Sequence, residues 1–337
     1  MKKILITGGT GFIGSHLTEK LLEEGNEITV LAMHNPIEDI ENENLELLRN
    51  IGVKIVFGDL RSVETLEKAV KGNEVVVHLA AISRPMNISQ QTYYDINEKG
   101  TINLLETCNK YKIKKIVHVS SVSVLGLSPD GNPLKEDDYQ DLNGDDYGLS
   151  KLKGEKAAID LGEKFQIPLT VIRPALVYGP RCVVRNIMFK FVQNKFFPLF
   201  GNGEAKMEFC YVDNLVCALI QAISHKYNGE VFNITDGKAY QISEVLNAIA
   251  DNLQVNRPSI NLPVWLGEFL GLTSELLFKV IRKSPPFSRT AAKWMSQDVN
   301  VYSCNKAIKV MEYTPKISLN EGVVKSIKWY REKGFLK

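Results

Sequence analysis

The stretch KKILITGGTGFIGSHLTEKLLEEG, residues 2–25, decides the fold. An apolar run suited to a buried strand passes directly into a glycine-rich turn, and a candidate helix follows until Gly25. Gly9, Gly11 and Gly14 satisfy the pattern GxGxxG, and Gly8, Gly11 and Gly14 satisfy GxxGxxG. Glycine permits a tight turn and a close approach of the backbone to a pyrophosphate, while the helix N-terminus offers amide hydrogens and a positive dipole end. A turn of this kind between a first strand and a first helix predicts dinucleotide binding.

Short apolar runs alternate with candidate helices over the first half of the chain. The runs are nearly continuous in hydrophobicity, as expected for parallel strands that are covered on both faces. The alternation predicts an α/β fold with a doubly wound parallel sheet, a Rossmann fold, for residues 1–180, with a return strand and helix from about 211–235. Residues 181–337 are expected to form mainly a smaller α/β lobe that binds substrate. The predicted strands are KKILIT, EITVLA, VKIVFG, EVVVHLA, KKIVHVSS and LTVIRPALVYG.

Polar residues mark the expected starts of other helices. Ser62 is a natural N-cap for the helix after the third strand. Asp213 is expected to cap a helix over DNLVCALIQAI, and Ser243 is expected to start a helix with EVLNAIADNL. Ser318 and Glu321 have the spacing of a capping box.

Composition narrows the class of protein. The chain has 337 residues, of which 44% are hydrophobic and 24% charged, as in ordinary globular proteins. A net charge of +2 gives no sign of a nucleic-acid partner. The most apolar later stretch, from Leu262, carries Glu268, Glu275 and Lys279, which argues against a membrane span. The five cysteines have no metal-ligand spacing, so we expect no metal site and reduced thiols in the cytoplasm.

The choice between NAD and NADP depends on the end of the second strand. An acidic residue there usually holds the adenosine ribose of NAD, but VLAMHN has Ala32 and Met33 at those positions. No arginine replaces the acid, and His34 is the nearest possible cation. An unpaired phosphate costs more than one lost hydrogen bond, so NAD is favoured over NADP. Asp59, in FGDL after the third strand, is well placed to meet the adenine edge.

A tyrosine and a lysine stand four residues apart in DDYGLSKLKGEKAA, at Tyr147 and Lys151. On a helix this spacing places both side chains on one face, where the lysine would lower the pKa of the phenol and make it a proton carrier. The same spacing occurs at Tyr111–Lys115 and at Tyr302–Lys306. Spacing alone therefore does not choose among the three pairs.

The chain resembles the extended short-chain dehydrogenase/reductase family, the NAD-dependent epimerase/dehydratase superfamily. The matching motifs occur in family order over roughly the first 180 residues. They are TGGTGFIG, GDL, HLAA, HVSS leading to VLG, the Tyr147–Lys151 pair and IRPALVYGP. The resemblance implies NAD(P) chemistry, a substrate lobe from the C-terminal half and, commonly, a homodimer.

The resemblance also implies roles for individual residues. By position it makes Tyr147 the general acid/base, Lys151 its partner and a ligand of the nicotinamide ribose, and Ser121 the donor to the developing oxyanion. Ser120 and Ser123 are close enough to be mistaken for that serine. The residues expected at the cofactor are Gly8, Gly9, Thr10, Gly11, Phe12, Ile13, Gly14, Asp59, Leu60, Leu79, Ala80, Ala81, Asn97, Ser120, Tyr147, Lys151, Pro174 and Val177.

Two features of the C-terminal half bear on the substrate class, and they leave more than one class open. Many nucleotide-sugar enzymes carry an arginine–aspartate pair where this chain has Met207–Glu208, and Lys206 cannot make the same bidentate contact. The stretch LPVWLGEFLGL resembles the 3β-hydroxysteroid dehydrogenase branch. We therefore expect hydride transfer with a hydrophobic secondary alcohol or ketone, 3β-hydroxysteroid-like or a β-hydroxy ketone. A nucleotide-sugar 4-epimerase or dehydratase is the alternative, with Arg185 or Arg289 on a phosphate. A non-catalytic NAD(P)-binding regulator is the second alternative.

Overall fold

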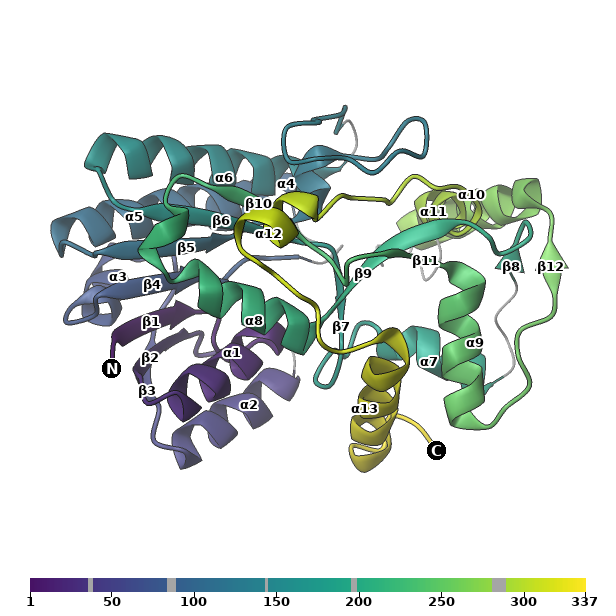
Figure 1. Ribbon diagram of the computed structural model, residues 1–337, viewed down its shortest axis with the longest axis horizontal. Coiled ribbons are helices and arrows are strands. Elements are labelled where there is room, and N and C mark those ends of the chain that lie inside the picture. Colours follow the sequence, from purple (N-terminus) through teal and green to yellow (C-terminus); the bar gives the residue numbers. More distant parts are fainter. Residues whose placement is uncertain (36–38, 84–88, 143–144, 195–198, 281–288) are drawn as a thin grey trace.

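The structure is a computed structural model, and its main feature is a seven-stranded parallel sheet in the order β10-β6-β5-β4-β1-β2-β3 (Figure 1). Every neighbouring pair of strands in this sheet is parallel. The strands are β1 (Lys3–Thr7), β2 (Glu27–Ala32), β3 (Lys54–Phe57), β4 (Val75–His78), β5 (Lys115–Val119), β6 (Leu169–Pro174) and β10 (Val231–Ile234). The structure describes residues 1–35, 39–83, 89–142, 145–194, 199–280 and 289–337.

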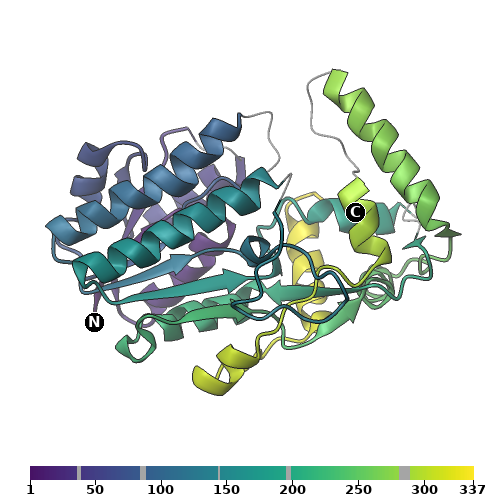
Figure 2. The ribbon, with the colours of Figure 1, turned by 90° about the horizontal axis from the view of Figure 1, so that it is seen from above.

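Helices cover both faces of the sheet, as the near-continuous hydrophobicity of its strands predicts. Side chains alternate along each strand, so Ile4 and Ile6 enter one core while Leu5 enters the other. The first core includes α1 (Phe12–Glu23), α2 (Asp39–Asn50) and α8 (Val212–Ala222). The second includes α3 (Val63–Val70), α5 (Gly100–Lys110) and α6 (Asp146–Phe165), the last two visible above the sheet in Figure 2. The prediction of a doubly wound sheet is confirmed.

The strand order reverses between β1 and β4. The chain runs from β1 outward through β2 to β3, then returns to the other side of β1 with β4. Ligands of such sheets bind outside the carboxyl ends of the strands at this switch point. The glycine-rich turn follows β1 directly, so the topology places it there.

The C-terminal half adds two small sheets beside the large one (Figure 1). One has the order β11-β9-β7 and the other pairs β12 with β8. Among the described residues, no helix is both long and apolar enough to cross a membrane. The remaining elements are α4 (Gln90–Tyr94), a π-helical turn (Asp95–Lys99), β7 (Leu176–Tyr178), α7 (Asn186–Gln193), β8 (Leu199–Phe200), β9 (Lys206–Tyr211), β11 (Ala239–Gln241), α9 (Ile242–Leu253), β12 (Asn261–Leu262), α10 (Val264–Val280), α11 (Arg289–Ser296), α12 (Asn305–Val310) and α13 (Leu319–Glu332).

Two of the predicted helix starts are confirmed and two are wrong. Ser62 is the N-cap of α3, and Ser318 forms a complete capping box with Glu321. Helix α8 begins directly after β9 with Tyr211 as N-cap, so the Asp213 carboxylate lies inside the first turn. Helix α9 is likewise capped by Gln241, ahead of Ser243.

Candidate functional site

A cavity of about 290 Å³ opens at the carboxyl ends of β1 and β4. Its walls come from the glycine-rich turn, the ends of β2 and β3, the segment after β4 and residues 181–184. Eleven of the residues expected at the cofactor line it. They are Gly8, Thr10, Gly11, Phe12, Ile13, Gly14, Asp59, Leu60, Leu79, Ala80 and Ala81.

The glycines of the turn are required by close packing of the backbone. A Cβ on Gly14 would overlap the Gly8 carbonyl oxygen and lie 2.7 Å from the Gly9 Cα. Gly8 has φ of +72°, and a Cβ there would lie 2.8 Å from the Ala80 amide nitrogen. Gly9 differs from the prediction, because it packs against the Val30 side chain and does not line the cavity. The turn thus leaves bare backbone at the start of α1, which fits a dinucleotide pyrophosphate.

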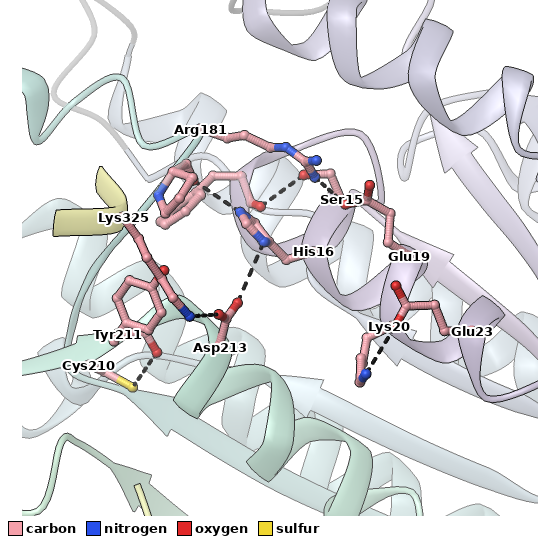
Figure 3. A network of polar contacts seen from close by, with 12 residues as sticks. Ser15, His16, Glu19, Lys20, Glu23, Arg181, Cys210, Tyr211, Asp213 and Lys325 are labelled. Atoms are coloured by element: carbon pink, nitrogen blue, oxygen red, sulfur yellow. Dashed lines mark hydrogen bonds and ion pairs between the residues drawn. The ribbon is translucent and has the colours of Figure 1, made fainter. Parts of the chain in front are cut away.

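Arg181 reaches the cavity from the segment after β7, and sequence reasoning missed it. Its backbone has φ of +68°, which is unusual for a residue other than glycine. Its guanidinium lies 2.5 Å from the Glu19 carboxylate of α1. The ion pair connects this segment to the helix that follows the glycine-rich turn (Figure 3). Nothing local in the sequence signals a contact across 162 residues.

His16 extends the same network towards the C-terminal helices (Figure 3). Its Nε2 lies 3.0 Å from the Pro180 carbonyl oxygen, which can only accept, so Nε2 carries the proton. Its Nδ1 faces the Asp213 carboxylate at 3.8 Å, and Lys325 faces the same carboxylate at 3.6 Å. Burial, and then the charge of Arg181, lower the pKa of His16. The network links the α1 wall of the cavity to α8 and α13.

At the far end of the cavity, Asp59 is held by Arg61. Two guanidinium nitrogens of Arg61 donate to its carboxylate at 2.9 and 2.6 Å, and this contact lowers the pKa of Asp59. The imidazole of His34 stacks on Phe57 with ring centres 4.6 Å apart. Met33 and Ala32 line the cavity, as does Glu41 of α2, which sequence reasoning also missed.

Ser121, Tyr147 and Lys151 come together where β5 ends and α6 begins. Asp145 caps α6, because its carboxylate accepts from the Gly148 amide at 2.8 Å, and this fixes Tyr147 in the first turn. The Ser121 hydroxyl donates to that of Ser123 at 3.0 Å. The Ser121 side chain is also the group that lowers the pKa of the Tyr147 phenol. Lys151 is buried one turn farther along α6.

The expected effect of Lys151 on Tyr147 is wrong for this structure. Burial raises the pKa of Tyr147 to about 12, and Lys151 is absent from the groups that shift it. The Lys151 ammonium instead donates to the Val119 carbonyl at 2.8 Å. Burial lowers the pKa of Lys151 to about 8. Hydrogen bonding to Ser121 is therefore the main local contribution that favours the phenolate.

Six other predicted cofactor residues lie outside the cavity lining, and Tyr147 and Lys151 of the cluster just described are two of them. The Asn97 side chain exchanges hydrogen bonds with both backbone groups of Ile82, at 2.9 and 3.0 Å. Ile82 itself lines the cavity, so Asn97 holds part of the wall. The others are Ser120, which is buried, Pro174, which ends β6, and Val177, which is half-buried in β7.

The tyrosines of the other two tyrosine–lysine pairs make hydrogen bonds elsewhere in the structure. The Tyr111 hydroxyl donates to Glu67 at 3.3 Å, at the end of α5. Tyr302 is buried, and its hydroxyl donates to the Gly126 carbonyl at 2.8 Å. Replacing Tyr302 would leave that buried carbonyl unpaired and would destabilise the chain. Tyr111 is therefore the better control when the catalytic role of Tyr147 is tested by mutation.

The C-terminal half offers mostly apolar or neutralised groups near the expected phosphate positions. Met207 is buried in β9, and burial raises the pKa of its neighbour Glu208 to about 8. Arg289 is paired with Glu275 at 2.9 Å. Arg185 is half-buried just before α7.

Comparison with known proteins agrees with this geometry. The NAD dependent epimerase/dehydratase family matches residues 4–235. A sterol-4-alpha-carboxylate 3-dehydrogenase (decarboxylating) of Mus musculus is 29% identical over 97% of this chain and 90% of its own length. A putative UDP-glucose 4-epimerase of Methanocaldococcus jannaschii is 29% identical over 97% of this chain and 98% of its own. The crystal structure of gox2253 superposes over the whole of both chains with a TM-score of 0.81 at 25% identity. The resemblance drawn from the motifs is confirmed: the chain belongs to the NAD dependent epimerase/dehydratase family and is an enzyme of the extended short-chain dehydrogenase/reductase type.

Proposed function

We propose that this enzyme is an NAD-dependent oxidoreductase that acts on a secondary alcohol or ketone of a hydrophobic, 3β-hydroxysteroid-like molecule. The observation that carries the substrate class is the outward face of α10. Trp265, Phe269 and Leu276 on this helix are 66%, 56% and 58% exposed. Large apolar side chains gathered at a surface mark a binding site more often than chance.

The exposed face of α10 is a continuous apolar arc. At 100° per residue, Leu272, Trp265, Leu276, Phe269, Thr273, Leu266, Leu277 and Leu270 occupy about 160° of the helix circumference, and Thr273 is the only polar member. The opposite side faces the protein: Gly267 packs on Phe200, and Glu275 pairs with Arg289. Figure 2 shows α10 standing away from the body of the molecule. A surface helix usually turns its apolar face towards the core, whereas α10 turns it outward. Such a face suits a hydrophobic substrate bound beside the helix.

The catalytic roles follow from the cluster at the start of α6. When bound, the nicotinamide supplies the hydride acceptor or donor. Tyr147 would take the proton of the substrate hydroxyl, or return it in the reverse direction. Ser121 would donate to the substrate oxygen, and Lys151 would hold the nicotinamide ribose. Because burial raises the pKa of Tyr147 to about 12, the phenol is protonated near neutral pH and would act as the acid towards a ketone oxygen. To accept a proton from an alcohol it would need the positive charge of the oxidised nicotinamide nearby, which favours the phenolate.

The remaining assignments belong to the same proposal. Residues 1–180, with the return from about 211–235, would hold the dinucleotide, and residues 181–337 would mainly bind substrate. The sterol dehydrogenase relative spans nearly the whole chain, which supports a shared plan for both halves. A homodimer in the cytoplasm is the assembly expected of such an enzyme.

A nucleotide-sugar 4-epimerase is the second candidate. It is favoured by the equally similar putative UDP-glucose 4-epimerase and by the half-buried guanidinium of Arg185, which could meet a diphosphate. Against it stands Met207, a buried thioether where that contact is expected.

A panel assay separates the two. The purified chain is offered sterols, long-chain β-hydroxy ketones and UDP-, GDP- and dTDP-sugars with NAD, and NADH fluorescence is followed. We expect NADH to accumulate with a hydrophobic alcohol. Interconversion of a nucleotide sugar without net NADH, together with no response to any hydrophobic alcohol, would favour the epimerase.

A further inference from the structure

The cofactor cavity contains a carboxylate that the sequence pattern does not place there. The end of β2, where an acid usually meets the adenosine ribose, presents only Ala32 and Met33. Glu41, from the first turn of α2, lines the same cavity together with both residues. We propose that the Glu41 carboxylate accepts hydrogen bonds from the adenosine ribose hydroxyls and disfavours a 2′-phosphate, so that it selects NAD over NADP.

Helix α2 is held so that Glu41 faces the cavity. Asn44, which is buried, donates its side-chain amide to the Thr10 carbonyl of the glycine-rich turn at 2.8 Å. Residues three apart lie on the same side of a helix, so the contact that fixes Asn44 on the turn also directs Glu41 towards it. Ile40 and Leu48 are buried beneath the helix and fix its roll.

The carboxylate of Glu41 is available for a ligand. Among the described residues it makes no hydrogen bond and no ion pair, although it is half-buried. Burial raises the pKa of Glu41, as expected for an acid that has lost water without gaining a partner. Ribose hydroxyls would supply the missing donors.

The cations around this end of the cavity are already engaged. The Arg61 guanidinium is bidentate on Asp59, and that of Arg49 lies 5.4 Å from the centre of the Phe57 ring. His34 stacks on the same ring. Among the described residues, a 2′-phosphate would therefore meet the Glu41 carboxylate without a dedicated cation, whereas a 2′-hydroxyl would meet a ready acceptor.

The alternative role for Glu41 is purely structural: its negative charge would stabilise the N-terminus of α2 through the helix dipole. That role would affect the stability of the helix and would weaken both dinucleotides equally. A ribose ligand would change their ratio.

The inference rests on the family's use of a dinucleotide and not on the substrate class. It is tested by fluorescence titration of the full chain with NADH and with NADPH, without substrate, so failure of the substrate proposal leaves it intact. Glu41→Gln should weaken NADH binding roughly 10-fold, as for loss of a charged hydrogen bond, and leave NADPH binding equal or tighter. Glu46→Gln, which removes the same charge from an exposed position of the same helix, should leave both affinities within about twofold.

NADH built with 2′-deoxyadenosine sharpens the test. The wild-type chain should bind it more weakly than NADH, and Glu41→Ala, which has no side-chain acceptor, should bind the two alike, because the hydroxyl and the carboxylate form one interaction. Equal losses for NADH and NADPH in Glu41→Gln, or a 2′-deoxy effect that persists in Glu41→Ala, would overturn the proposal. An unchanged thermal unfolding midpoint would show that the variant folds.

Discussion

The glycine-rich turn at residues 8–14 and helix α10 differ in what constrains them. At the turn, a Cβ on Gly14 would overlap the backbone of the same chain. On α10, Trp265 and Phe269 point away from the chain that carries them. The residues of the turn are therefore constrained by contacts within the chain, whereas the outward side chains of α10 are exposed to solvent. The chemistry of the turn can therefore be derived from the fold, while that of α10 depends on its ligand.

The largest expected effect concerns Tyr147, the proposed proton carrier at the start of α6. Tyr147→Phe should lower turnover by about 10²–10⁴ while NADH affinity changes less than about twofold, because only the proton transfer is lost. Steady-state kinetics and fluorescence titration measure the two. Tyr111→Phe removes a hydroxyl from the same residue type at the end of α5 and should keep near-normal turnover. Full activity in Tyr147→Phe would show that Tyr147 is not the proton carrier.

The second effect tests the internal constraint itself. Gly14→Ala should lower NADH affinity by about 100-fold or more, since the new methyl must push the Gly8 carbonyl and the turn apart. Gly25→Ala is the matched control, because φ there is +79° but nothing lies within 4 Å of a Cβ. It should cost about 1 kcal/mol of stability and leave affinity unchanged. Circular dichroism checks that both variants fold. Equal affinity in both variants would mean that the close approach in the turn is unimportant.

The third effect probes the outward face. Leu270→Glu puts a charge into the apolar arc at an exposed position, so the chain should fold normally. The Michaelis constant for a hydrophobic substrate should rise roughly 5- to 10-fold, as expected when about 40 to 55 Å² of apolar contact is lost, with little change in NADH affinity. Val324→Glu, an exposed apolar position on α13, is the control and should change neither. A rise with both variants would indicate a general surface effect.

The last effect is a pH dependence of folding stability in the C-terminal half. The pKa of Glu208 is raised from 4.5 to about 8 in the folded chain, so the folded state holds a proton that the unfolded state loses. This group therefore makes stability fall as pH rises from about 5 to 8. Urea unfolding at several pH values should show the wild type losing free energy relative to Glu208→Gln over that range. Glu268→Gln, at an exposed carboxylate of α10, is the control. A pH-independent difference for Glu208→Gln would mean that its carboxyl is ionised throughout.

Sequence patterns were sufficient where neighbours in the chain create the structure. The period of the strands and the turn at Gly8–Gly14 predict the sheet and the cavity wall. Patterns failed where contacts join distant segments. Arg181 reaches Glu19 across 162 residues, and the helix that carries Glu41 is joined to the glycine-rich turn by the hydrogen bond from Asn44 to Thr10. The raised pKa of Tyr147 could not be predicted from the sequence either, because it results from burial of the phenol among side chains from other segments.

The most direct test of the central claim follows the hydride. A 3β-hydroxysterol carrying deuterium on its carbinol carbon is incubated with the enzyme and NAD, and the NADH is examined by mass spectrometry. We predict deuterated NADH and the matching ketone, and neither with Tyr147→Phe. Unlabelled cofactor and unchanged sterol, with UDP-galactose converted to UDP-glucose under the same conditions, would contradict the claim and make the enzyme a nucleotide-sugar epimerase.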